Sequence, residues 1–391
     1  MPEGLTIEVI PSLADIPAAD WDRLANPPGA AFNPFVTHAF FHALEASGSA
    51  TAQTGWLGQH ILLKEEGHIR AILPLYLKSH SQGEYVFDHA FAEAFARAGG
   101  RYYPKLQSAV PFTPVTGPRL LAGNAPDAPA LKAALLKAAL ALAEKREASS
   151  VHLTFLPRAD WEALGDGKTF LQRADTQFHW ENRGYRDFSE FLATLSSNRR
   201  KNLRKERAAA LSPGIQIEWV TGSDITEAHW DAFFAFYMDT GARKWGRPYL
   251  TRDFFSRIGQ HLAPHILLIL CKREGRYIAG ALNLIGSDTL YGRNWGAIEH
   301  HDFLHFEACY YQAIDFAIAR GLSRVEAGAQ GEHKLARGYM PVATHSLHHF
   351  THPGLMRAAR DYLDAERAAV AEERGLLAEM GPFRQTQPEN E

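Results

Sequence analysis

The sequence has few cysteines and no strong excess of charge of one sign. Its 391 residues include only Cys271 and Cys309, which excludes a disulfide-stapled scaffold and fits a reducing compartment. Their spacing forms no Cys-x-x-Cys pair, so a structural zinc cluster is not expected. Lysine and arginine number 41 and aspartate and glutamate 44, which gives a net charge of −3. A generic polyanion-binding protein is therefore excluded, and any nucleic-acid contact must come from a local basic patch.

Long hydrophobic segments and targeting signals are also missing. Residues 1–11 contain neither a basic region nor an apolar stretch of signal-peptide length. Apolar runs such as residues 266–271 are far too short to span a bilayer. We therefore expect a cytoplasmic protein without an integral membrane segment. The composition, with 46% hydrophobic and 22% charged residues, is that of ordinary globular domains.

The hydrophobic pattern predicts a similar order of elements in the two halves of the chain. In each half, helices precede a group of strands, and one longer helix leads into a last strand. Strands are expected at residues 5–10, 58–65, 71–78, 151–156, 215–220, 266–271, 277–285, 289–296 and 325–329, and the longer helices at 130–147 and 306–320. We therefore predict two α/β units with mixed sheets, residues 1–167 and 168–352, followed by a helical tail over residues 353–391.

Glu326 is the first candidate for a catalytic base. It follows Val325 on a predicted strand, and the three residues after it, 327–329, are all small. A carboxylate in such a place can be partly desolvated and take a proton from an attacking amine. Glu332 and His333 lie just beyond, in a glycine-flanked loop able to close on a ligand, and are the other catalytic candidates. The structural alternative is a strand-end glutamate paired with a nearby arginine.

A basic segment is expected to form one face of a helix. Arg200, Arg204 and Arg207 recur at positions i, i+4 and i+7 of the predicted helix 198–211. Such a face can hold the phosphates of a nucleotide, of coenzyme A or of a tRNA acceptor end. The alternative interpretation is a solvated helix face, which is the usual role of a charge run.

Three segments of the sequence are distinctive, namely residues 33–95, 195–220 and 306–341. Together they resemble the FemAB-like branch of the GNAT acyltransferase superfamily, the group associated with peptidoglycan biosynthesis or recognition. The third segment is also similar in layout to the core of leucyl/phenylalanyl-tRNA-protein transferases. The resemblance implies tandem GNAT units and transfer of an acyl or aminoacyl group from an activated donor, acyl-CoA or aminoacyl-tRNA, to an amine. It leaves the donor and the small-molecule or peptide acceptor open.

The resemblance also suggests where a donor would bind. In GNAT folds the acyl donor lies where the central strand diverges from its parallel neighbour, which assigns Arg293, Trp295 and Arg337 to donor binding together with the basic helix. Members that bind acetyl-CoA carry a Gln/Arg-x-x-Gly-x-Gly/Ala loop whose backbone N–H groups hold the pyrophosphate. After Gly296 this chain continues with AIEHHDFLHFEACYY, which contains no glycine. This absence favours an activated donor other than acetyl-CoA.

Polar and aromatic residues outside these motifs are candidates for contacting the acceptor. The predicted acceptor-contacting residues are Tyr85, Asp88, Tyr103, Lys105, His305 and Glu307. The first four come from aromatic segments that are also suited to core or loop packing. The last two lie at the start of the predicted helix 306–320, where we expect them to line the mouth of the cleft.

The 19 histidines raise the question of a metal site. No His-Glu-x-x-His helix is present in the sequence, and the histidines of residues 345–352 lie beside a strand in which alternate residues face opposite ways. We therefore expect no functional metal and no tightly bound cofactor, with acyl-CoA or aminoacyl-tRNA as co-substrate.

Two other functions compete with acyl transfer. A non-catalytic module of the same fold, binding a peptide or a cell-wall precursor, is the main alternative. A nucleic-acid-binding protein that uses the basic helix is the weakest reading, and DNA is not an expected partner, because the net charge is −3.

Overall fold

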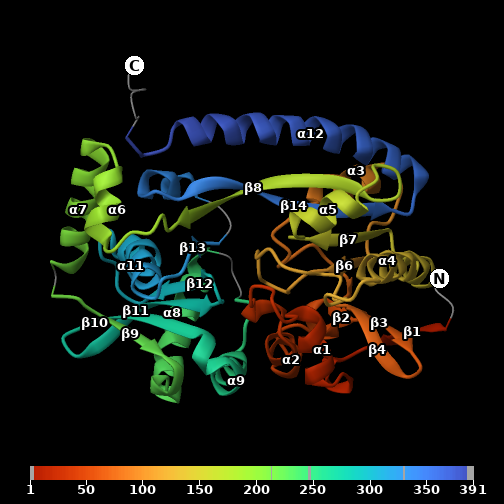
Figure 1. Ribbon diagram of the computed structural model, residues 1–391, viewed down its shortest axis with the longest axis horizontal. Coiled ribbons are helices and arrows are strands. Elements are labelled where there is room, and N and C mark those ends of the chain that lie inside the picture. Colours follow the sequence, from red (N-terminus) through yellow and green to blue (C-terminus); the bar gives the residue numbers. More distant parts are fainter. Residues whose placement is uncertain (1–3, 213, 245–247, 329–330, 385–391) are drawn as a thin grey trace. The chain divides into compact units, whose positions relative to one another are not determined.

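The computed structural model describes residues 4–212, 214–244, 248–328 and 331–384, without the side chains of residues 242–244 and 332. The chain divides into two compact units. Unit 1 comprises residues 1–175, 249–257 and 343–371, and unit 2 comprises residues 176–248, 258–342 and 372–391. Each unit combines a mixed β-sheet with packed helices (Figure 1), as the alternation of strands and helices in the sequence predicts.

Unit 1 holds most elements of the first half of the chain. Its helices are α1 (Ala18–Ala25), α2 (His38–Ala46), α3 (His89–Arg97), α4 (Ala128–Lys145), α5 (Arg158–Leu164), the first part of α9 (Arg252–Leu262) and most of α12 (Pro353–Glu379). Its strands are β1 (Leu5–Ile10), β2 (Trp56–Gly58), β3 (His60–Glu65), β4 (His68–Leu73), β5 (Tyr76–Lys78), β6 (Lys105–Ser108), β7 (Ser150–Thr154) and most of β14 (Met340–Phe350). β1, β3 and β4 form one antiparallel sheet, and β2-β5-β6-β7-β14 follow one another in a second, where β6 and β7 are parallel.

Unit 2 contains the elements that build the candidate site. Its helices are α6 (Phe188–Thr194), α7 (Ser197–Leu211), α8 (Glu227–Lys244), α10 (Leu304–Phe306), the π-helical turn η6 (Glu307–Tyr311) and α11 (Gln312–Ala319). Its strands are most of β8 (Leu171–Glu181), with β9 (Gln216–Thr221), β10 (Ile266–Arg273), β11 (Arg276–Ile285), β12 (Thr289–Ala297) and β13 (Arg324–Glu326). They follow the order β8-β13-β12-β11-β10-β9, in which β12 and β13 are parallel and the other pairs antiparallel.

The two units repeat one connection. In each, antiparallel strands lead through a crossover helix, α4 or α11, to a strand that pairs in parallel with the last of them. That strand then pairs antiparallel with a long strand, β14 for β7 and β8 for β13. The sequence therefore correctly predicts mixed sheets with a helix crossover in both halves, and a C-terminal helix.

Some predicted strand ends are wrong. The strand expected at residues 58–65 is interrupted at Gln59, and the one expected at residues 71–78 is interrupted at residues 74–75. The strand expected at residues 325–329 ends at Glu326. Gly328 has φ +76°, a left-handed conformation that glycine adopts readily but that does not continue a strand. This early end leaves β12 paired with β13 only over residues 289–291, whereas its other edge stays paired with β11.

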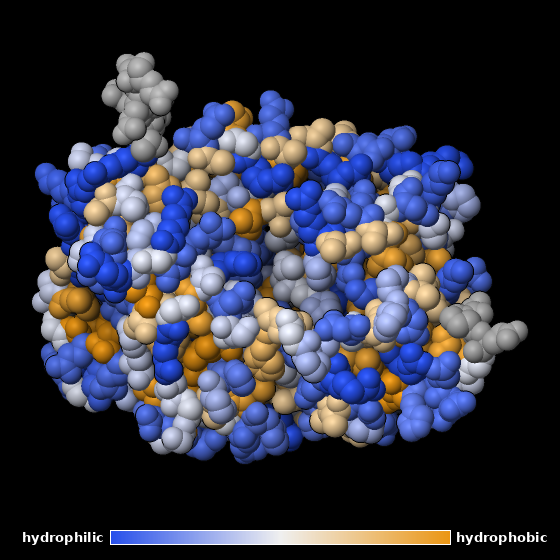
Figure 2. Space-filling view, in the orientation of Figure 1, coloured by the Kyte–Doolittle hydropathy of each residue, from blue (hydrophilic) through white to orange (hydrophobic). Residues whose placement is uncertain are grey.

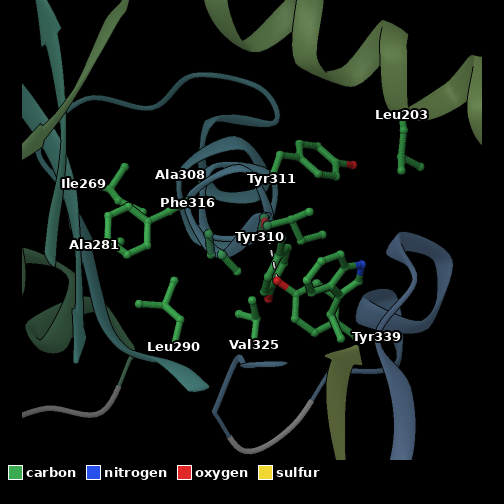
Figure 3. Packing of buried hydrophobic residues seen from close by; sticks show 14 of the residues in the cluster. Leu203, Ile269, Ala281, Leu290, Ala308, Tyr310, Tyr311, Phe316, Val325 and Tyr339 are labelled. Carbon is green, nitrogen blue, oxygen red and sulfur yellow. Dashed lines mark hydrogen bonds between the residues drawn. The ribbon is translucent and has the colours of Figure 1, made fainter. Parts of the chain in front are cut away.

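Opposite faces of the unit 2 sheet are covered by different helices. On one face, Leu290 and Val325 point toward Phe316 and the helix that runs from η6 into α11, as Figure 3 shows. On the other face lies α8, since a methyl group added at Gly296 would meet the backbone of Phe236 at 2.2 Å. Burying each large apolar side chain in such a core stabilises the fold by about 1.5–3 kcal/mol.

The surface over α7 is mainly polar. Hydrophilic side chains dominate the face drawn in Figure 2, including the region over α7. Among the residues that the structure describes, no helix combines the length and the apolar character needed to cross a bilayer.

Candidate active site

The parallel strands β12 and β13 diverge soon after they meet. They pair only over residues 289–291 and 324–326, although β12 continues to Ala297. β12 also carries a bulge. Its Asn294 lies opposite Leu282 and its Gly292 opposite Asn283, so that Arg293 is the extra residue. Bulges bend a strand and interrupt its ladder, and here the bulge and the end of β13 together open a gap between the two strands.

A small cavity lies beside this gap, on the side of η6. Its volume is about 80 Å³ and its lining residues are Ala281, Leu282, Asn283, Gly292, Arg293, Asn294, Trp295, His305, Cys309, Tyr310 and Ala327. A second cavity of about 280 Å³ is lined by Thr240, Trp295, Ala297 and the segment 299–306. Trp295 and His305 line both cavities, with their rings edge to face at 5.4 Å. Three predicted residues, Arg293, Trp295 and His305, are thus brought together at the gap.

Glu326 is buried on the opposite face of the sheet from that small cavity. Successive side chains of a strand alternate in direction, and its neighbour Val325 belongs to the core against α11. The Glu326 side chain instead lies near Arg324 Nη1, 3.7 Å from its Oε1, and near His179 Nδ1, 3.8 Å from the same atom. Its Oε2 has no hydrogen-bond partner among the described residues.

The surroundings of Glu326 make its carboxyl a weak acid. Burial raises its pKa to about 7, with Asp288 adding to the effect and Arg324 opposing it. Burial also lowers the pKa of His179 to about 3, so this imidazole is neutral at pH 7 and supplies no positive charge. The side chain of Arg324 is 41% exposed, and its charge is therefore screened by water. The arginine pairing named as the structural alternative is present, but it does not outweigh burial.

The other two catalytic candidates lie in the 3-10 segment η7 (Glu332–Arg337). The side chain of Glu332 lies outside the described part of the structure. His333 Nε2 is 2.8 Å from the hydroxyl of Tyr310, and its ring is near those of His305 and Phe306. His333 is therefore next to the residues that line the cavities, on the side of η6.

Lys334 was not selected from the sequence, although it follows His333 directly. Its ammonium donates to the Gly328 carbonyl at 3.0 Å, and the side chain is buried. Burial lowers its pKa to about 8. A lysine in a polar loop gives no sign of such burial in the sequence alone.

Two of the arginines assigned to donor binding are held by carboxylates. Arg207 donates from Nε and Nη2 to the buried Glu307, at 3.1 and 2.8 Å, and from Nη2 to Asp315 at 2.7 Å. Arg337 lies 3.5 Å above the ring of Phe306 and donates to Glu206 at 2.8 Å. Arg207 thus connects α7 to η6 and α11, and Arg337 connects η7 to α7. Glu307 does not line the mouth of the cleft as predicted, because it is the buried ion-pair partner of Arg207.

The remaining cations of α7 face solvent. Arg200 is partly exposed, and the other four are exposed, namely Arg199, Lys201, Arg204 and Lys205. In the described part of the chain the structure gives these five side chains no ion pair. With Arg207 occupied by carboxylates, they form the basic surface of this helix.

The acceptor candidates of the first half lie in unit 1, within a buried polar network. Lys105 and Asp88 are both buried, and Lys105 Nζ contacts Asp88 and Glu84 at 2.5 and 2.6 Å. Tyr103 bonds Ser81 through its hydroxyl at 2.7 Å. Tyr85 is partly exposed and has φ +58°. Asp88 and Lys105 are thus part of the unit 1 core, where they satisfy each other's charge.

Metal ligation finds no support in the described residues, which contain no group of three histidine, cysteine, aspartate or glutamate side chains able to hold an ion. The absence of a functional metal stays a prediction, since elemental composition is a property of the purified protein.

The architecture of this chain is similar to that of several known protein structures. The fold is similar to that in a structure described as FemX, with TM-score 0.54 and 12% identity over 90% of this chain and 100% of that one. A structure of L-PGS from Bacillus licheniformis gives TM-score 0.49 and 11% identity, covering 86% of this chain and 99% of the other. A tandem GNAT protein from the clavulanic acid biosynthesis pathway gives TM-score 0.46 and 12% identity, covering 89% and 99%.

No protein in a search of curated sequences matches the chain. The prediction of an α/β fold with tandem GNAT units, mixed sheets and a C-terminal helix is confirmed by the repeated topology and by the likeness to FemX. The profile of the FemAB-like family, described as peptidoglycan biosynthesis/recognition, matches residues 12–385. The chain therefore belongs to the FemAB-like family of peptidoglycan biosynthesis and recognition proteins.

Proposed function

We propose that the protein is an N-acyltransferase that moves an acyl or aminoacyl group from an activated donor to an amine. The observation that carries the proposal is a buried carboxyl, Glu326, of pKa about 7, beside the gap between β12 and β13. A general base acts best when its pKa lies near the working pH. Membership of a peptidoglycan biosynthesis and recognition family supports an amine of a peptide or cell-wall precursor as acceptor.

In the proposed step, the amine nitrogen of the acceptor forms a bond to the carbonyl carbon of the donor. The bond from that carbon to the donor's leaving atom breaks, which is an ester oxygen in aminoacyl-tRNA or a thioester sulfur in acyl-CoA. The Glu326 carboxylate takes a proton from the nitrogen and then releases it to the leaving atom, which regenerates the carboxylate. In this proposal, backbone amides of the diverging strand β12 polarise the carbonyl oxygen.

Two features favour aminoacyl-tRNA over acyl-CoA as the donor. The segment after β12, where acetyl-CoA-binding members hold a pyrophosphate in a glycine-containing loop, has no glycine over residues 297–311. The exposed Arg204 and the partly exposed Arg200 provide a basic surface that attracts an RNA backbone.

The test is single-turnover transfer to a peptide that carries a free lysine amine. Radiolabelled glycyl-tRNA, alanyl-tRNA and acetyl-CoA are offered separately to the wild type, to Glu326→Gln and to a control variant, Glu274→Gln. The side chain of Glu274 is 79% exposed in the wild type. We expect labelled peptide from an aminoacyl-tRNA, a rate about 10²–10⁴-fold lower for Glu326→Gln, and no loss for Glu274→Gln. If no donor labels the peptide but the peptide binds, the non-catalytic binding module is correct instead.

A further inference from the structure

We propose that Asn283 selects the transferred group, by accepting a hydrogen bond from its α-amino group inside a cavity that admits only a small aminoacyl chain. The inference rests on the proposed function and names the substrate class of the same site. It is carried by three observations on the residues around the bulge in β12, namely an unsatisfied buried acceptor, the direction in which that acceptor points, and the size of the cavity.

The first observation is the hydrogen bonding of the Asn283 amide. The residue is 1% exposed. Its Nδ2 donates to the carbonyls of Leu267 and Ala281, both at 3.4 Å, which orients the amide. Its Oδ1 has no hydrogen-bond partner among the described residues. A buried acceptor left without a donor costs about 1–3 kcal/mol, so a ligand that supplies an N–H gains this amount on binding.

The second observation is the direction of this oxygen. A methyl group added at Gly292 would lie 3.4 Å from Asn283 Oδ1 and also 3.4 Å from the backbone oxygen of Glu326. Oδ1 therefore points to the place where β12 and β13 separate. Both Asn283 and Gly292 line the small cavity, so a group held there lies against the gap in which the acyl carbonyl is proposed to bind.

The third observation is the volume and the rigidity of the cavity. An engineered cavity of about 150 Å³ holds benzene, which has six non-hydrogen atoms. The cavity here measures about 80 Å³, so by proportion it holds about three or four such atoms, the size of a glycyl group. Tyr310 closes one side, and it is held by His333 at its hydroxyl and by the Tyr339 hydroxyl at its carbonyl.

The location of the cavity assigns it to the donor rather than to the attacking amine. It lies on the η6 side of the sheet, whereas the carboxyl of Glu326 lies on the other side. An amine that gives its proton to Glu326 must approach from the Glu326 side. The group in the cavity is then the one attached to the donor carbonyl, and its nitrogen is bound by Asn283 rather than consumed.

Binding of stable donor analogues tests the inference apart from catalysis. The probes are 3′-deoxyadenosines with an amide at the 3′ position, acylated by glycyl, by the isosteric propionyl or by phenylalanyl. Isothermal titration of the full-length wild type is expected to show glycyl bound at least about 10-fold more tightly than propionyl, because hydrogen bonds to charged groups contribute about 1.5–3 kcal/mol. Phenylalanyl is expected not to bind, for lack of room.

Two variants test the contributions of Asn283 and Gly292 separately. Asn283→Leu removes the acceptor at similar size and should bring the glycyl and propionyl affinities within about twofold. Gly292→Ala should weaken both, because its methyl group fills the gap at contacts of 3.4 Å that require little movement. Gly375→Ala, where a methyl group meets nothing within 4 Å, is the matched control with unchanged affinities. Thermal unfolding confirms that each variant is folded, and Gly292→Ala decides the question if Asn283→Leu does not fold.

The outcomes separate this inference from the proposed function. Equal binding of glycyl and propionyl by the wild type, or an unchanged preference in Asn283→Leu, overturns the role of Asn283. Tight binding of the phenylalanyl probe overturns the size limit. A glycyl preference that Asn283→Leu abolishes, in a protein that transfers to no amine, supports the inference while the transferase proposal fails. Wild-type transfer with no binding of any probe overturns the inference alone.

Discussion

Replacing Glu326 by glutamine should make the protein more stable in alkaline solution while it slows the reaction. The variant keeps the size and shape of the side chain but cannot ionise. The Glu326 carboxyl of the wild type is 5% exposed, and burial raises its pKa from 4.5 to about 7. Because the folded state binds the proton more tightly than the unfolded state, the stabilisation by Glu326 is fully present below pH 4.5 and is lost as the pH rises through 7.

The size of the effect follows from the two pKa values. A rise from 4.5 to about 7 corresponds to about 3 kcal/mol of unfolding free energy, lost between acidic and alkaline solution. Glutamine avoids this loss. Thermal melts should therefore give a higher Tm for Glu326→Gln than for the wild type at pH 8, and similar Tm values at pH 5.

The same carboxyl should govern the rate. A base of pKa about 7 is ionised to about 1% at pH 5 and about 90% at pH 8, so single-turnover transfer should rise about tenfold per pH unit below pH 6. The residual transfer rate of Glu326→Gln should not show this rise with pH between pH 5 and pH 7. A wild-type inflection near 4.5, or a variant that is less stable than the wild type at pH 8, would show that Glu326 is an ordinary ion-pair partner and refute the reasoning.

Three further experiments test separate parts of the structure. In urea titrations, Arg207→Met should lower the unfolding free energy by about 3 kcal/mol, because it leaves the buried Glu307 without its ion pair. The control variant Arg200→Met should change the unfolding free energy by less than about 0.5 kcal/mol. The double variant Arg200→Gln/Arg204→Gln should weaken tRNA binding and reduce its dependence on salt in filter-binding assays; an unchanged salt slope would contradict an RNA surface on α7. His152→Gln, at the position in unit 1 that corresponds to Glu326, should cost about 1–3 kcal/mol of stability and leave transfer unchanged.

The fold could be predicted largely from local patterns. Strands β10, β11 and β12 are bounded by turn residues, and α11 carries an apolar stripe of period 3.6, so their type and order follow from nearby residues. The left-handed Gly328 that ends β13 was not predicted, because glycine in a strand pattern does not by itself reveal a positive φ. The strand interruptions at Gln59 and at residues 74–75 could not be predicted either, because they depend on how a long strand bends between two sheets.

For the candidate site, the sequence indicates only features that depend on neighbouring residues. Glu326 was selected because small residues follow it, a feature of the adjacent sequence. Asn283 was missed because its importance comes from lying opposite Gly292 across a bulge, and register is set by the whole sheet. The pairing of Arg207 joins residues about 100 positions apart, so a basic run alone did not distinguish it from its solvent-exposed neighbours.

The tandem repeat explains why the proposed chemistry is assigned to unit 2. In unit 1, His152 of β7 pairs with Gln107 of β6 and faces His348, just as Glu326 of β13 pairs with Tyr291 and faces His179. Burial lowers the pKa of His152 to about 3, which makes it a poor base at neutral pH. The same strand geometry thus holds a buried carboxyl of raised pKa in one unit and a neutral imidazole beside a network of ion pairs in the other. The proposed function therefore depends on the side chain at this position rather than on the fold.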